Sequence, residues 1–226
     1  SLRSPCNILI GACALFDVLH QVPLFIMIRS VSRSSVLACG CVSILQFVPE
    51  MGCAAGSFAV LSIGVDRLLS VIAPNRYQQS NARVYLTAHF FVIFSFCAFN
   101  AFLMFHFYRE HPVLCQIPDA FHDGGVSWWA GAIAVVDVIA AIVYALTWSR
   151  IKSRADLLEE SSVRRIFRTI ILVTTFDVLG WATSQMIVAV MFALDLPEHM
   201  RLSVLCFAGI PVNLGISVKM SVYYLT

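Results

Sequence analysis

Blocks of apolar residues alternate along the chain with short polar connectors. Six such blocks run over roughly residues 5–28, 38–72, 84–108, 128–149, 166–194 and 202–224. Each is long enough for a helix that crosses a lipid bilayer, which takes about 20 residues. The blocks are continuously apolar, whereas the strands of a membrane barrel alternate between apolar and polar residues. The pattern predicts an all-α, multi-pass transmembrane helix bundle with six spans.

The composition agrees with a membrane protein and excludes several other classes. Hydrophobic residues make up 59% of the 226-residue chain and charged residues 12%, whereas soluble domains carry about 25% charged residues. A net charge of +2, with no basic run interleaved with aromatic residues, does not favour a nucleic-acid partner. The sequence contains no nucleotide-binding loop and no metalloprotease or hydrolase motif. We therefore expect no enzymatic activity, no cofactor and no metal site.

The basic residues predict the orientation in the membrane. If the N-terminus is cytosolic, the cytosolic connectors and span ends hold nine basic residues, namely Arg3, Arg76, Arg83, Arg150, Lys152, Arg154, Arg164, Arg165 and Arg168. The opposite side then holds four, namely Arg29, Arg33, Arg109 and Arg201. Cytosolic connectors carry an excess of Lys and Arg, so this orientation is expected. It places Asp66 and Arg67 at the cytosolic mouth of the second span.

The chain begins and ends abruptly. It opens on the polar stub "SLRS", without an initiator Met, and enters a span at once. The stub does not resemble a signal peptide, which has a small-residue cleavage site after a short apolar core. We expect residues 1–226 to form a single transmembrane domain that lacks material at both ends.

The eight cysteines fall into two groups. Five lie inside spans or at their edges, where thiols are ordinarily buried; these are Cys6, Cys13, Cys53, Cys97 and Cys206. Cys39 and Cys41, at the outer end of the second span, and Cys115, in an outer connector, face the oxidising side. A disulfide between these two regions is expected there. The alternative is that all three are unpaired.

Charged residues inside spans are costly and usually face a partner or a cavity. Apart from those at the span ends, they are Asp17, Glu50, Asp137, Asp177 and Lys219. Glu50 precedes Arg67 by 17 residues, which places it about 25 Å outward along the helix. In that outer half it could contact a ligand or make a purely structural hydrogen bond. The sequence does not choose between Asp137 and Asp177 as the lining of a polar core.

The second span ends in "DRLLSVIAPNRY", which resembles a motif at the inner end of the third helix of rhodopsin-like G-protein-coupled receptors. The matching residues are Asp66, Arg67, Val71, Pro74 and Tyr77, while Leu68 replaces the usual tyrosine. The start "LRSPCNILIGACALFDVLHQ" resembles the second helix of the nematode Srsx-type serpentine chemoreceptors, with Asp17 at the buried aspartate. In "VLGWATSQ", Trp181 stands at the switch tryptophan of the sixth helix. The chain thus resembles helices two to seven of a seven-helix receptor, with the first helix and the C-terminal tail missing.

The resemblance implies a function and its partners. Receptors of this kind lie among lipids in the plasma membrane, in this family in the cilia of sensory neurons. They bind an extracellular ligand, here a small odorant or a short peptide, and activate a heterotrimeric G protein. In the family, the aspartate neutralises the arginine at rest, and an outward movement of the sixth helix frees it. The alternative for Asp66 and Arg67 is an interfacial ion pair that only anchors the helix.

The resemblance also implies roles for individual residues. G-protein coupling falls to Asp66, Arg67, Pro74 and Tyr77, and the activation switch to Asp17, Trp181, Lys219 and Tyr223. Glu50 is the implied ligand contact, and Cys41 and Cys115 form the implied disulfide.

Lys219 departs from the family pattern, because an asparagine usually stands four residues before the tyrosine of the seventh helix. A lone ammonium group in a low-dielectric core is strongly unfavourable, and so is an unpaired carboxylate. We therefore expect Asp17 and Lys219 to form an ion pair, and the resting receptor to be insensitive to sodium. The alternative is that Lys219 extends to the cytosolic interface.

Three other interpretations remain. A neuropeptide receptor shares the same motifs. A six-span transporter or channel could be built around Asp17, Asp137, Asp177 and Lys219, although no related halves with broken helices are found. The third is that the fragment is non-functional without its first helix.

Overall fold

The structure is a computed structural model that describes residues 4–31, 39–108, 121, 124–153, 194 and 198–225, together with 175–176, 178–184, 186–188 and 190–191. Within these ranges it describes the side chains except those of 22–45, 198–199, 201–202, 205 and 219–225. Cys115, Asp177 and several of the basic residues named above lie outside the described residues. The same holds for the side chains of Cys39, Cys41, Lys219 and Tyr223.

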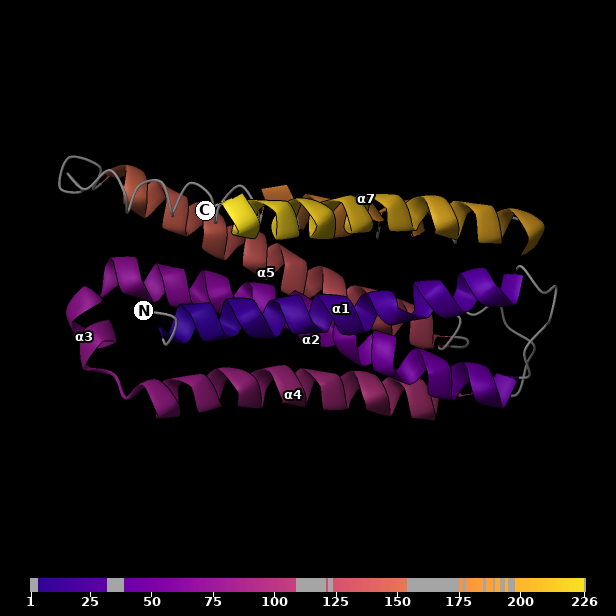
Figure 1. The fold of residues 1–226 in the computed structure, drawn as a ribbon, viewed down its shortest axis with the longest axis horizontal. Helices are drawn as coiled ribbons and strands as arrows, with labels where there is room; N and C mark the ends of the chain where they lie inside the picture. Colours follow the sequence, from indigo (N-terminus) through magenta and orange to yellow (C-terminus); the bar gives the residue numbers. More distant parts are fainter. Residues whose placement is uncertain are drawn as a thin grey trace. The chain divides into compact units, whose positions relative to one another are not determined.

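Helices make up the described part of the chain (Figure 1). They are α1 (Pro5–Val31), α2 (Cys39–Ile72), α3 (Pro74–Gln79), α4 (Ala82–His106), α5 (Gly125–Ser153) and α7 (Glu198–Leu225). The described residues between 175 and 191 are helical as well, and no strand occurs among the residues that the structure describes. The all-α prediction is confirmed. Five of the six apolar blocks coincide closely with one helix each, and the block at 166–194 is only partly described.

Three helices are long and apolar enough to cross a membrane, by length and composition, among the described residues. They cover Gln46–Ile72, Ala82–His106 and Gly125–Ser153, with hydropathies of 1.6, 1.9 and 2.2. Shorter apolar helices cover Val178–Val188 and Cys206–Val218. Large apolar side chains such as Phe91 and Phe105 of α4 are exposed, as is expected of a surface that faces lipid.

Residues 74–79 correct one detail of the sequence interpretation, which treated 73–83 as a polar connector. They form the short helix α3, which follows α2 after the single residue Ala73. Pro74 occupies its first position, where a fixed φ suits a helix and the missing N–H group costs nothing. The N–H group of Tyr77 donates to the carbonyl oxygen of Ala73 at 3.0 Å.

Side-chain caps mark the beginnings of two helices. Ser4 precedes Pro5 of α1, and its hydroxyl oxygen accepts the N–H group of Asn7 at 3.4 Å. Asn81 precedes α4, and its side-chain oxygen accepts the N–H group of Arg83 at 3.0 Å. The first N–H groups of a helix have no partner within the helix, so Ser and Asn at these positions fix where the helices begin.

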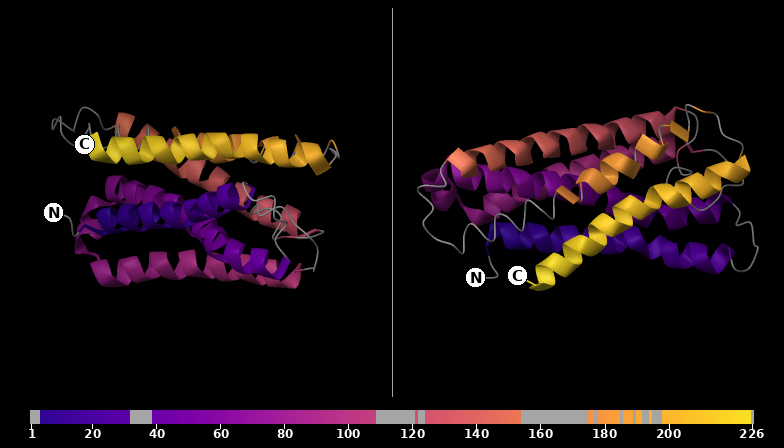
Figure 2. Two further views of the ribbon diagram at one scale, coloured as in Figure 1. Left: turned by 45° about the vertical axis from the view of Figure 1, so that its right-hand side comes forward. Right: turned by 90° about the horizontal axis from the view of Figure 1, so that it is seen from above.

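The chain divides into two compact units, which are described separately. One comprises Ser1–Ile63 and Gln78–Ile133, and the other Gly64–Tyr77 and Ala134–Thr226. The helices α2 and α5 are each continuous and contribute residues to both units. Figure 2 shows the helices from two further directions. In the first unit, α1 contacts α4.

In the first unit, α1 and α2 approach so closely that only glycine fits at residue 52. A Cβ atom on Gly52 would lie 2.6 Å from the backbone nitrogen of His20 and 2.9 Å from the carbonyl oxygen of Phe16. One turn further along α2, the Cβ position of Gly56 lies 3.6 Å from a carboxyl oxygen of Asp17. Small residues let helix backbones pack closely where no hydrophobic effect drives association within the bilayer.

Aromatic side chains join α2 to α4 in the same unit. The rings of Phe58 and Phe96 have centroids 5.3 Å apart, and those of Phe47 and Phe105 have centroids 6.0 Å apart. Such pairs contribute beyond the area they bury. The thiol of Cys97 also donates to the carbonyl oxygen of Met51 at 3.9 Å.

Two glycines allow close contacts in the second unit. A Cβ atom on Gly64 of α2 would lie 2.8 Å from the ring of the buried Tyr144 of α5. A Cβ atom on Gly180 would lie 2.7 Å from the carbonyl oxygen of Pro211 in α7. The residue after Gly180 is Trp181, so this contact fixes the backbone next to the predicted switch tryptophan.

Replacement of Gly52 by alanine tests the contact between α1 and α2. The new methyl group meets backbone atoms of α1, which cannot rotate away, so Gly52→Ala should lower the free energy of unfolding by roughly 1–3 kcal/mol. Gly11→Ala is the matched control, since no atom lies within 4 Å of its Cβ position. The melting temperature of Gly11→Ala in lipid nanodiscs should equal that of the wild type or exceed it. Equal melting temperatures for the two variants would show that the close contact does not exist.

Candidate functional site

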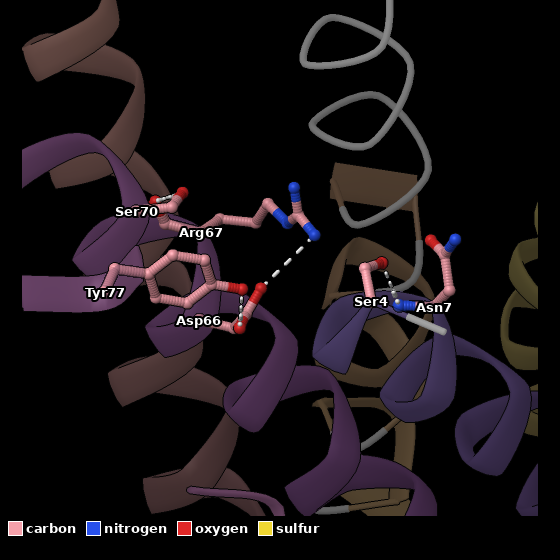
Figure 3. A network of polar contacts seen from close by, with 6 residues as sticks. All are labelled: Ser4, Asn7, Asp66, Arg67, Ser70 and Tyr77. Carbon is pink, nitrogen blue, oxygen red and sulfur yellow. Dashed lines mark hydrogen bonds and ion pairs between the residues drawn. The ribbon is translucent and has the colours of Figure 1, made fainter. Parts of the chain in front are cut away.

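The C-terminal end of α2 carries a buried carboxyl group that contacts two side chains. Asp66 is 0% exposed. The Tyr77 hydroxyl donates to Oδ1 of Asp66 at 2.9 Å, and Nη2 of Arg67 lies 3.2 Å from Oδ2 (Figure 3). All three residues belong to the second unit. We call Asp66, Arg67 and Tyr77 the Asp66 site.

The break between α2 and α3 brings Tyr77 to Asp66. The two residues are 11 positions apart in the sequence, too far for neighbours on one straight helix. Ala73 interrupts the helix, Pro74 begins α3, and the turn returns the Tyr77 ring to the end of α2. Pro74 itself is exposed, and it begins the short helix that carries Tyr77.

The side chain of Arg67 is partly accessible, whereas that of Asp66 is not. The Arg67 side chain is 17% exposed, against 0% for that of Asp66. The backbone carbonyl of Arg67 accepts the Ser70 hydroxyl at 2.8 Å. Two charges removed from water are tolerated when they pair and their remaining groups are hydrogen-bonded. The guanidinium group is thus tied to a buried carboxylate while part of it still reaches the surface.

The four residues of the predicted activation switch are described to different degrees. Asp17 is a buried residue of α1, facing Gly56 of α2. Trp181 lies in the helical stretch 178–184 and is half-buried. Lys219 and Tyr223 lie in α7, with their side chains outside the described set. The ion pair between Asp17 and Lys219 therefore stays a prediction.

Glu50 lies in the first unit and bonds to an indole. Its side chain is 0% exposed, and Nε1 of Trp129 in α5 donates to its Oε1 at 2.8 Å. The buried Phe121 stacks on Trp129, with ring centroids 5.4 Å apart and an interplanar angle of 21°. We call Gln46, Glu50, Phe121 and Trp129 the Glu50 site. The structural hydrogen bond considered for Glu50 is present.

The same face of α2 carries buried oxygen atoms that have no hydrogen-bond partner among the described residues. They are Oε1 of Gln46, Oε2 of Glu50 and the hydroxyl oxygen of Ser57. Gln46 is 2% exposed, and it precedes Glu50 by one helical turn. A buried polar group without a partner costs about 1–3 kcal/mol, so these atoms leave the Glu50 site short of hydrogen-bond donors.

Several residues of these sites were missed by the sequence analysis. Trp129 gave no signal, because its contact with Glu50 joins residues 79 positions apart. Asn100 of α4 is 0% exposed, and its amide nitrogen donates to the carbonyl oxygen of Phe96 at 2.8 Å. An amide side chain in the largely apolar block 84–108 could have indicated this buried position. Ser70 could not have been distinguished from any other polar residue at a helix end.

The cysteine predictions are tested in part. Cys6, Cys13, Cys53 and Cys97 are buried, as expected. Cys206 is exposed, and the expectation of burial was wrong for it. It lies on α7 beside the exposed Phe207, on a surface that an apolar thiol can occupy because lipid and not water covers it. The bridge between Cys41 and Cys115 falls outside the described residues and stays a prediction.

These features define a multi-pass helical membrane protein with a buried polar site at a helix end. The family model described as "Serpentine type 7TM GPCR chemoreceptor Srsx" matches residues 1–226. The chain therefore belongs to the Srsx family of serpentine seven-transmembrane chemoreceptors. A search of curated proteins found no match. The family is one of receptors, in agreement with the resemblance seen in the motifs.

The bond between Trp129 and Glu50 can be tested on stability. Trp129→Phe removes the indole N–H group, so that Oε1 of Glu50 loses its donor and neither carboxyl oxygen has a described hydrogen-bond partner. We expect a loss of roughly 1–3 kcal/mol in the free energy of unfolding. The neighbouring Trp128 is 66% exposed, so Trp128→Phe is the control and should change little. Thermal unfolding in nanodiscs measures both, and a Trp129→Phe variant as stable as the control would contradict the bond.

Proposed function

We propose that this protein is a chemosensory receptor of the plasma membrane that binds a small extracellular ligand and activates a heterotrimeric G protein. The observation that carries the proposal is the Asp66 site, in which a partly exposed arginine is tied to a fully buried carboxylate. Membership of a G-protein-coupled chemoreceptor family supports the class of ligand and of partner in general terms.

The geometry supports a two-state mechanism. In one state Asp66 holds the Arg67 guanidinium in an ion pair, and the Tyr77 hydroxyl donates a hydrogen bond to the other oxygen of the same carboxylate. In the other state Arg67 leaves Asp66 and binds backbone carbonyl groups at the C-terminus of a helix of the G protein. Those carbonyls lack partners within their own helix and attract a cation. A ligand shifts the equilibrium only as far as it prefers the second state.

The ligand is proposed to act at the other end of the same helix. Glu50 belongs to α2, as Arg67 does, and is separated from it by about 25 Å of continuous helix. A ligand that changes the contact between Glu50 and Trp129 changes the packing of α2 against α5 in the first unit. The continuous helix α2 then links the ligand site to the Asp66 site.

Arg67→Ala tests the coupling. The variant lacks the guanidinium group for the partner's carbonyls, so ligand-driven nucleotide exchange on the G protein should fall at least about 10-fold, as the loss of charge-assisted hydrogen bonds implies. Expression at the cell surface should stay near normal. Arg83→Ala, at the exposed start of α4, is the matched control and should exchange nucleotide as the wild type does. Retained exchange in Arg67→Ala would remove Arg67 from the coupling site.

A further inference from the structure

We infer that the Glu50 site recognises the protonated amine of a small aromatic ligand. The inference rests on the proposed function and names the chemical class of ligand for it. It follows from the acceptor atoms of Gln46 and Glu50 and from the aromatic surface beside them.

One oxygen of the Glu50 carboxyl group accepts a hydrogen bond, and the other accepts none from the described residues. Trp129 donates to Oε1 at 2.8 Å, whereas Oε2 has no partner within the described part of the chain. Glu50 is 0% exposed, so bulk water does not solvate that oxygen. The group best suited to a buried carboxylate oxygen is a cationic N–H donor, because such bonds are shorter and stronger than those between neutral groups.

A second acceptor stands one helical turn away. Oε1 of Gln46 is also buried and without a partner among the residues described. Residues four apart on a helix lie on the same face, with Cβ atoms about 5–6 Å apart. An ammonium group carries three N–H donors, so one amine can donate to both oxygens. A ligand hydroxyl has a single donor, and a ligand carboxylate has none and would be repelled by Glu50.

The surroundings of the acceptors favour an aromatic ligand. Trp129, which donates to Glu50, stacks against Phe121 at a centroid distance of 5.4 Å. Aromatic faces attract cations within about 6 Å of the ring centroid, and they stack on a flat ring. Because neither acceptor atom is exposed in this structure, the amine must displace side chains that now cover them.

The test compares three ligands of similar size on the receptor in lipid nanodiscs. The probes are 2-phenylethylamine, 2-phenylethanol and 3-phenylpropionate, and binding is measured as the ligand-dependent rise in melting temperature. The wild type should bind the amine roughly 10- to 100-fold more tightly than the alcohol, and should not bind the acid. Glu50→Gln keeps the size and the acceptor for Trp129 but removes the charge, and should bind the amine no better than the alcohol.

Control variants separate the charge at Glu50 from other effects. Asp137→Asn removes another buried acid, on α5, and should keep the preference for the amine. Phe121→Ala removes an aromatic face beside the acceptors and should weaken the binding of both the amine and the alcohol. If Glu50→Gln does not fold, Gln46→Met supplies the answer, because it removes the second acceptor and should reduce the preference several-fold.

Each outcome decides between the inference and its rejection. Equal binding of the three probes, no binding of the amine, or a preference that survives in Glu50→Gln and Gln46→Met would overturn it. The binding measurement needs no G protein. A receptor that prefers the amine but drives no nucleotide exchange therefore supports the inference and contradicts the proposed coupling. A receptor that drives nucleotide exchange with a ligand other than an amine supports the proposed coupling and contradicts the inference.

Discussion

The carboxyl group of Asp66 has no exposed surface, and the end of α2 is arranged to satisfy it. A charge buried in a low-dielectric region is tolerated only with partners that neutralise it and bond to its oxygens. Arg67 supplies the opposite charge from the next position in the chain, and Tyr77 supplies a hydroxyl from α3. The short helix α3, its proline start and the break at Ala73 all serve to bring that hydroxyl back to the carboxylate.

The same helix carries a second buried carboxyl group that is less completely satisfied. Glu50 has the indole N–H group of Trp129 on one oxygen, and the described residues place nothing on the other. Proteins rarely leave buried polar atoms without partners, and such atoms often mark functional positions. We interpret the difference as a division of roles along α2. Asp66 is held by the protein itself, whereas Glu50 is available to a ligand.

The sequence predicted the helices well, because a helix that crosses a bilayer must have a minimum length and a mostly apolar composition. A single polar residue within such a segment does not hide this pattern. The sequence also singled out Asp66 and Tyr77, since both belong to one short motif, and the structure brings them together. It missed the helix α3, although Pro74 was a signal for its beginning. It could not find Trp129 or the tight contact at Gly52, because each depends on which residues of a distant helix lie opposite. Such pairings follow from packing in three dimensions and leave no trace in the order of residues along one helix.

The claim that the buried carboxylate of Asp66 holds the receptor at rest is tested most directly by Tyr77→Phe. This change removes one hydroxyl group and leaves the ring and the charge of Arg67 in place. A hydrogen bond of this kind contributes about 0.5–1.5 kcal/mol, so its loss in the resting state should raise ligand-independent nucleotide exchange by roughly 2- to 10-fold. The maximal exchange driven by ligand should stay the same. Ligand-independent exchange that is unchanged or lower in Tyr77→Phe would contradict the claim.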